Sequence, residues 1–173
     1  PSALFANGLA QYGHTVDFAS NNYDTFDGSV DLSHYDVVVL GLAFYSLDPM
    51  PLAGQESIAD FVHNGGGFVT GEWLSWRQSA TGGFSTLYDI MPITTDGSYI
   101  DYTGGSVIYQ QVTPDPVLNA GLPDSFEISL AGQGSEYIVP RNGSTVFYSG
   151  DATALDFPSA GVVGWQQGSG RVI

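Results

Sequence analysis

The apolar run Val37–Leu40 constrains the fold of this chain more than any other segment. An unbroken apolar strand leaves no position for solvent, so it predicts burial on both faces, as in a parallel sheet covered by helices. Apolar residues spaced three and four apart predict helices on either side of it, over about 2–11 and 52–63. Strands expected at 14–20 and 67–70 complete an α/β order with right-handed crossovers.

The second half of the chain has a different pattern. Beyond Ile93, short segments of alternating polar and apolar residues are separated by glycine, proline and aspartate turns, which is typical of strands. The expected elements are a short helix at 86–90 and strands at 107–110, 126–130, 145–149 and 161–165. Because Gly170–Ile173 resembles the start of another strand, we expect residues 1–173 to form a single α/β domain that is part of a longer chain.

The charge balance excludes several functions. The chain has 173 residues with 18 acidic and 3 basic side chains, a formal net charge of -15, and it contains no lysine and no cysteine. Arg77, Arg141 and Arg171 are too scattered to form the cation cluster that binds phosphates, which excludes a nucleic-acid surface. The longest apolar run is far below the roughly 20 residues that a membrane span needs. Without cysteine, disulfides, thiolate zinc sites and cysteine nucleophiles are excluded as well.

The composition also bears on location. Charged residues make up only 12% of the chain, roughly half the usual share, whereas hydrophobic residues make up 43%. A weakly charged, cysteine-free surface fits a secreted bacterial protein better than a halophilic one. We therefore expect an extracellular or cell-surface location, with a processed or excised N-terminus because the chain shows neither an initiator methionine nor a signal peptide.

Four stretches resemble a known family. Asp31–Gly41 and Asp60–Thr70 resemble the glutamine-amidotransferase-like superfamily, with a strand, a helix end and a Gly-Gly-Gly turn in the same order. Thr113–Leu122 is similar to the family's "HPI..GL" turn, and Gly164–Val172 to its "G-x-GRV" strand. The most similar branch is that of the ThuA-like (trehalose-utilisation-like) proteins. The resemblance implies a flavodoxin-like three-layer sandwich with a mostly parallel sheet, whose first strand would lie upstream of Pro1.

The departures from that family concern its chemistry. Class I amidotransferases carry a nucleophilic cysteine at the turn after the strand that Phe68–Thr70 occupies here, and ThuA-like proteins often have a histidine near that point. This chain has Gly71–Trp73 there and no cysteine, so glutaminase activity is excluded. In the family's second turn, Asp115 replaces the histidine.

Glu72 is the strongest candidate for a functional residue, because it follows the expected strand at 67–70. Ligands of open α/β sheets bind beyond the carboxyl ends of the strands, and aromatic planes beside a carboxylate suit a sugar ring. The alternative is structural: a carboxylate at the start of a helix would interact with backbone amides, beside tryptophans packed in the core. The predicted site consists of the catalytic residue Glu72 and the ligand-binding residues Trp73, Trp76, Arg77, Tyr45 and Asp115.

Glycoside hydrolysis would need a second carboxylate. It would lie about 5 Å from Glu72 in a retaining enzyme and roughly 6.5–9.5 Å away in an inverting one. The adjoining loops offer Asp48, Asp89, Asp96 and Asp101. Loop carboxylates are usually solvated turn formers, and the sequence does not select among these four.

The loop 21–31 holds oxygen ligands of the kind that calcium uses, at Asp24, Asp27 and Asp31. Their spacing departs from that of an EF-hand, and Asx turns explain them more simply. The three histidines stand at scattered or helix-capping positions. We therefore expect no metal and no cofactor, with calcium in this loop as the weaker alternative.

Two functions remain. The first is a non-catalytic, amidotransferase-like binding or interaction domain of a larger exported protein, with a small sugar or polysaccharide as ligand and the rest of the parent chain as partner. The alternative is a carbohydrate-active hydrolase that uses Glu72 with a loop aspartate.

Overall fold

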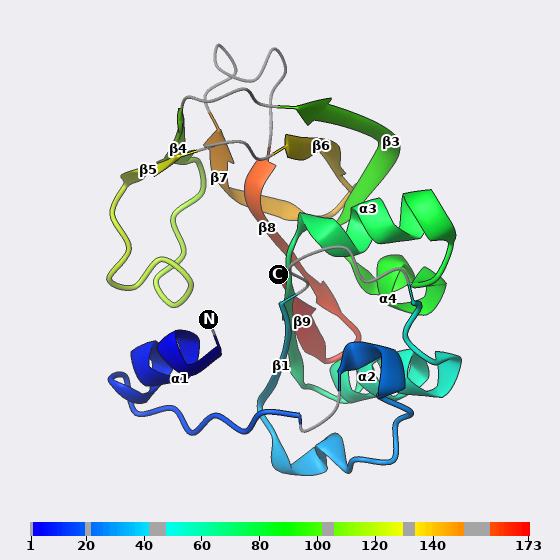
Figure 1. Cartoon of the computed structure of the whole chain (residues 1–173). Coiled ribbons are helices and arrows are strands. Elements are labelled where there is room, and N and C mark those ends of the chain that lie inside the picture. Colours follow the sequence, from blue (N-terminus) through cyan, green and yellow to red (C-terminus); the bar gives the residue numbers. More distant parts are fainter. Residues whose placement is uncertain (1, 20–21, 42–47, 102–105, 130–133, 151–159) are drawn as a thin grey trace.

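The computed structural model describes residues 2–19, 22–41, 48–101, 106–129, 134–150 and 160–173 (Figure 1). Its helices are α1 (Ser2–Ala10), α2 (Leu52–His63), α3 (Glu72–Thr81) and α4 (Ser85–Ile90), with single 3-10 turns η1 (Tyr23–Thr25) and η2 (Leu32–His34). The strands are β1 (Val37–Leu40), β2 (Gly67–Thr70), β3 (Ile93–Asp101), β4 (Ser106–Gln111), β5 (Ser125–Ser129), β6 (Gly134–Pro140), β7 (Thr145–Gly150), β8 (Ala160–Gln167) and β9 (Gly170–Val172).

Most of the expected elements are confirmed. The helices at 52–63 and 86–90 form as α2 and α4, and the apolar run forms β1. The strands expected in the second half form as β4, β5, β7, β8 and β9. The strand expected at 14–20 is wrong, because residues 14–19 form neither helix nor strand. Alternation specifies the two faces of a strand but not a partner, and no described strand pairs with this segment.

Seven strands form one mixed sheet in the order β1-β2-β9-β8-β7-β4-β5, and β3 and β6 pair separately. Only the β1–β2 and β2–β9 pairings are parallel, whereas β9–β8, β8–β7, β7–β4 and β4–β5 are antiparallel. The expected mostly parallel, flavodoxin-like sheet is therefore not found. The hairpin turns explain this: a two-residue turn with Gly168 at φ 62 links β8 to β9, and such short links join only antiparallel strands.

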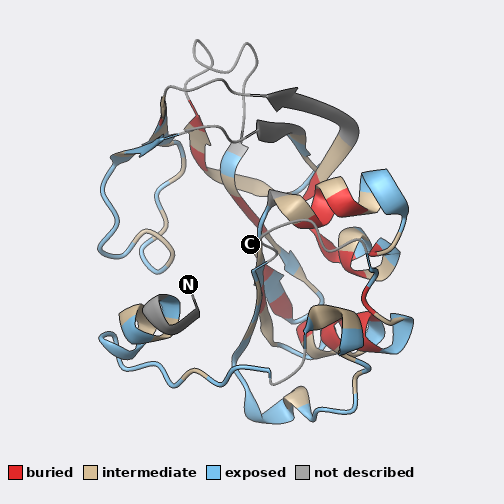
Figure 2. Cartoon of the chain, viewed as in Figure 1, coloured by how far each residue is buried: buried red, intermediate tan, exposed pale blue. Residues whose placement is uncertain are grey.

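The hydrophobic core lies between the sheet and the helices α2, α3 and α4. Phe68 of β2 and Val172 of β9 are fully buried there, together with Val62 of α2, Leu74 of α3 and Leu87 of α4. Figure 2 shows the buried residues concentrated on this side of the molecule. We call it the covered face of the sheet.

The opposite side of the parallel strands is the open face, defined by Val37, Val39 and Val69. Their side chains are 48%, 44% and 36% exposed. The prediction that the apolar run is buried on both faces is therefore wrong for β1. Figure 1 shows α1 beyond this side of β1, opposite α2, and Phe5 of α1 is itself 48% exposed. The described helices thus bury one face of these strands and leave the other accessible.

Candidate functional site

The carboxyl ends of β1, β2 and β9 meet at one edge of the sheet, because these strands are parallel. Thr70 connects all three ends. Its hydroxyl donates a hydrogen bond to the Leu40 carbonyl oxygen at 3.1 Å, and its backbone N–H donates to the Ile173 carbonyl oxygen at 3.0 Å. The chain then passes through Gly71 directly into α3. This is the edge at which open α/β sheets bind ligands.

Helix α3 was not among the expected elements, although the structural alternative for Glu72 placed that residue at the start of a helix. The helix carries four of the predicted site residues. Gly71 is its N-cap, in an extended conformation and without a side-chain hydrogen bond to the helix, and Gly82 ends it at φ 69 in the left-handed region. The Gly82-Gly83 pair was the sequence signal for this helix end. Glu72 is the first helical residue, but its side chain lies outside the described part of the structure, so its catalytic role remains a prediction.

Trp73 and Trp76 lie together on the first turns of α3. Their ring centroids are 5.5 Å apart with an interplanar angle of 78°, an edge-to-face pair, and both side chains are half-buried. This geometry is the favourable one for two aromatic quadrupoles. The structure therefore brings two of the predicted ligand-binding residues into one aromatic pair beside the strand end.

Arg77 of α3 is only 3% exposed, and its Nη1 and Nη2 atoms have no hydrogen-bond partner among the described residues. The guanidinium of Arg141, in contrast, is hydrogen-bonded, as buried guanidinium groups usually are. Its Nε donates to the Ile93 carbonyl oxygen at 2.8 Å, and its Nη2 donates to that of Tyr88 at 2.9 Å. Burying a guanidinium without partners is costly, so Arg77 marks α3 as a region where packing alone does not account for the sequence.

The segment between β4 and β5, to which Asp115 belongs, lies on the other side of the sheet from α3 (Figure 1). Its carboxylate accepts hydrogen bonds from the backbone N–H groups of Val117 at 2.9 Å and Leu118 at 2.8 Å. The hydrogen bond from Leu118, followed by that from Val117, holds the pKa of Asp115 below its ordinary value. The charge of Arg171 lowers this pKa further. Asp115 also lines a cavity of about 260 Å³ with Arg171 and Phe147. The structure thus does not bring Asp115 together with the tryptophan pair.

The remaining predicted residues are dispersed. Tyr45 lies in 42–47, outside the described residues. Asp27 and Asp31 accept hydrogen bonds from Ser29 and Ser33, two residues ahead, as in Asx turns. The serine side chains first, and then the backbone N–H groups, lower the pKa of each aspartate. Asp24 has one buried carboxylate oxygen without a partner in the described chain. Within that same part of the chain, no three acidic or histidine side chains gather as metal ligands would.

Comparison with known proteins gives matches in structure only. No protein-family model and no curated protein sequence matches the chain. The cytoplasmic protein STM3548 from Salmonella typhimurium is similar with a TM-score of 0.67 and 21% identity, over 98% of this chain and 73% of that one. A ThuA-like protein from Parabacteroides merdae is similar with a TM-score of 0.62 and 17% identity, over 99% of this chain and 71% of that one.

A further similar structure is larger. The β-galactosidase from Bacillus circulans sp. alkalophilus matches with a TM-score of 0.59 and 17% identity, over 84% of this chain but only 20% of the enzyme. At these identities the comparisons establish a shared fold. Across the described residues, no helix has the length and apolar character needed to cross a membrane.

Proposed function

We propose that this chain is a non-catalytic, carbohydrate-related binding or interaction domain with an amidotransferase-like, ThuA-like ancestry, and that it belongs to a larger protein. The Trp73–Trp76 pair carries the proposal. Two half-buried rings at the carboxyl edge of parallel strands offer an apolar surface next to hydrogen-bonding backbone groups, which is what a sugar ring requires.

The similar structures support this choice. The chain resembles ThuA-like proteins over nearly its whole length, and it resembles a fifth of a β-galactosidase. A fold that occupies a fifth of a glycosidase is compatible with an accessory domain that binds or positions rather than reacts. The lack of cysteine removes the chemistry of the amidotransferase nucleophile, which agrees with a non-catalytic role.

A glycan-binding screen followed by calorimetry tests the proposal. The wild-type chain should bind at least one mono- or oligosaccharide, and Trp73→Ala and Trp76→Ala should each weaken that binding about tenfold or more because they remove the stacking surface. Tyr12→Ala is the matched control, since it removes an aromatic ring that is 83% exposed on another segment. Binding that is absent, or that survives both tryptophan substitutions, contradicts the proposal.

The hydrolase alternative is decided by Glu72→Gln. If Glu72 were a catalytic carboxylate, wild type would release reducing sugar and this variant would not, although it would still bind the ligand. Under our proposal neither form hydrolyses any glycan. The export of the parent protein is part of the proposal as well, and fractionation of the producing cells would check it. The similar Salmonella protein is described as cytoplasmic.

A further inference from the structure

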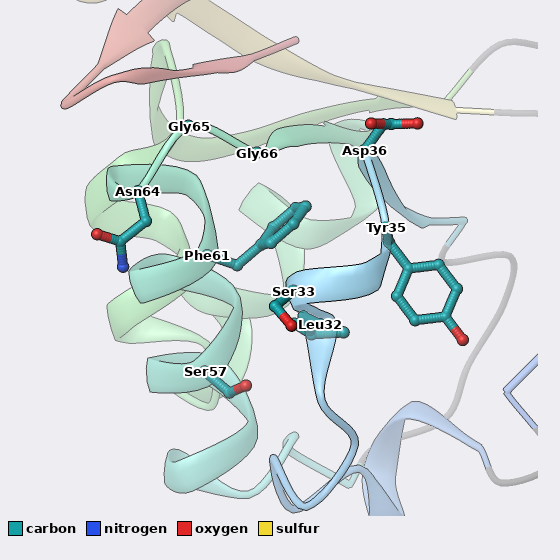
Figure 3. A pocket seen from close by; sticks show the side chains of 9 residues that line it. All are labelled: Leu32, Ser33, Tyr35, Asp36, Ser57, Phe61, Asn64, Gly65 and Gly66. Atoms are coloured by element: carbon teal, nitrogen blue, oxygen red, sulfur yellow. The ribbon is translucent and has the colours of Figure 1, made fainter.

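A pocket lies where β1 and β2 begin, at the edge of the sheet opposite the Trp73–Trp76 pair. It has a volume of about 620 Å³, which falls within the roughly 300–1,000 Å³ range of small-molecule sites. Its walls are η2, the segment Tyr35–Asp36 that leads into β1, the exposed side of α2, and the turn Asn64–Gly66 that leads into β2 (Figure 3). Nothing in the proposed function uses this pocket.

The pocket is built on a close contact between Phe61 and Gly66. A Cβ atom at Gly66 would overlap the far end of the Phe61 ring, so glycine lets the turn pass close to that ring without displacing it. The Gly66 N–H also donates a hydrogen bond to the Phe61 carbonyl oxygen at 3.0 Å. Figure 3 shows the ring between α2 and the Tyr35–Asp36 segment. The half-buried Phe61 ring therefore forms an apolar wall of the pocket.

Asp36 is held in place by the sheet. Its carbonyl oxygen accepts a hydrogen bond from the Gly67 N–H at 2.9 Å, at the first step of the β1–β2 pairing. Its carboxylate makes no hydrogen bond or ion pair with other described residues, and neither does the Ser57 hydroxyl, whereas the Ser33 side chain is hydrogen-bonded to Asp31. Asn64 uses its Nδ2 to donate to the Asp60 carbonyl oxygen at 2.9 Å, which leaves its own amide oxygen as an acceptor.

The lining is therefore rich in acceptors and lacks cations. The three arginines of the chain lie elsewhere: Arg77 in α3, Arg141 against Tyr88, and Arg171 in the cavity beside Asp115. With a net charge of -15 and no lysine, the protein offers an anion nothing to pair with at this site. A cation, in contrast, meets the Asp36 carboxylate, acceptor oxygens and the Phe61 ring.

We propose that this pocket binds a small organic cation of the alkylammonium class. The ammonium group pairs with the Asp36 carboxylate, and the alkyl stem lies against the Phe61 ring. The site is independent of the carbohydrate proposal, because it lies at the other edge of the strands and selects a ligand of different charge.

The test compares 1,4-diaminobutane with 1,4-butanediol, which has the same length but no charge, by saturation-transfer NMR and calorimetry at about 150 mM salt. We expect the diamine to bind and the diol not to bind. Asp36→Asn should weaken diamine binding about tenfold or more, because it removes the charge while keeping the shape. Phe61→Leu should weaken it less, since it removes the ring but keeps an apolar wall. Thermal unfolding confirms that each variant is folded.

Asp60→Asn is the matched control. This substitution also removes one negative charge, but from a residue of α2 that does not line the pocket. It should change the affinity for the diamine by less than about twofold. If Asp36→Asn and Asp60→Asn lowered the affinity for the diamine equally, the binding would be unspecific attraction to an acidic protein, and the proposal would be overturned. Equal binding of diol and diamine, or no binding of the diamine, would overturn it as well. Trp73→Ala should leave diamine binding unchanged, which separates this result from that of the carbohydrate test.

Discussion

The two faces of the parallel strands differ sharply although their residues are much alike. On the covered face, Phe68 and Val172 are fully buried beneath α2, α3 and α4. On the open face, Val39 and Val69 stand side by side in the β1–β2 register and remain 44% and 36% exposed. The difference teaches that an apolar residue in such a strand stabilises the fold only as far as another layer covers it.

The largest expected effect comes from shortening a valine on the covered face. Val172→Ala should lower the free energy of unfolding by about 2–3 kcal/mol, because it removes two buried methyl groups and leaves a cavity. Val69→Ala makes the same chemical change on the neighbouring strand, but on the open face, and should cost less than about 1 kcal/mol. Urea denaturation measures both. Equal losses would mean that the open face is covered in solution.

A second comparison uses glycines. A Cβ atom at Gly170 would overlap the carbonyl oxygens of Val62 and Gly66, which are backbone atoms of the covered side. Gly170→Ala should therefore destabilise the protein by about 1–3 kcal/mol. Gly41→Ala places a Cβ where no atom of the described residues lies within 4 Å and should change stability far less. Thermal unfolding of the pair checks the close fit of β9 against the end of α2, and similar midpoints would contradict it.

A smaller effect concerns the hydrogen bond that joins the sheet to α4. Trp165 Nε1 donates to the Ile90 carbonyl oxygen at 2.8 Å. Trp165→Phe keeps an aromatic ring but removes this donor, so we expect a loss of about 1 kcal/mol in urea denaturation. Gln166→Ala, at the next position of the same strand, is the control. Gln166 is exposed, and within the described part of the chain its side chain hydrogen-bonds only to Gly168. A stability loss that is no larger for Trp165→Phe than for this control would show that the bond contributes little.

The smallest effect is a pH dependence of stability at Asp115, which lies on the side of the sheet away from α2, α3 and α4. Because its folded-state pKa is lowered, the ionised Asp115 contributes stability that is present above the ordinary pKa of an aspartate and is lost as the pH falls through the lowered value. Asp115→Asn should thus melt below wild type at neutral pH, and the gap should narrow toward about pH 3. A gap that stays constant with pH would exclude the charged hydrogen bonds as its cause.

Local patterns predicted the elements that carry strong periodicity. The spacing of Ile58, Phe61 and Val62 indicated α2, and the apolar run indicated β1. The partners of these elements were not predictable in the same way. The valines of β1 do not reveal whether a layer covers their second face, and the alternation at 14–20 does not reveal whether a strand pairs with it.

The candidate site was predicted only in part. The position of Trp73 and Trp76 after a strand indicated the correct edge of the sheet, but the helix that brings their rings together went unrecognised because Glu72–Thr81 lacks a clear apolar stripe. The partnerless burial of Arg77 is a property of packing, which sequence spacing does not encode. The pocket around Asp36 is formed by residues from segments far apart in the chain, each of them unremarkable alone.

The position of β9 between β2 and β8 bears on how the protein is made. Gly67 of β2 pairs with Arg171, and Thr70 is hydrogen-bonded to Ile173. On the ribosome, the edge of β2 that pairs with β9 therefore stays unpaired until residues 170–173 have been synthesised. Such distant pairings form slowly, since a long loop must close first. During translation we therefore expect the first half to remain an incompletely folded intermediate with exposed apolar surface, to which chaperones can bind. Its sheet becomes complete only when the β8–β9 hairpin pairs with β2.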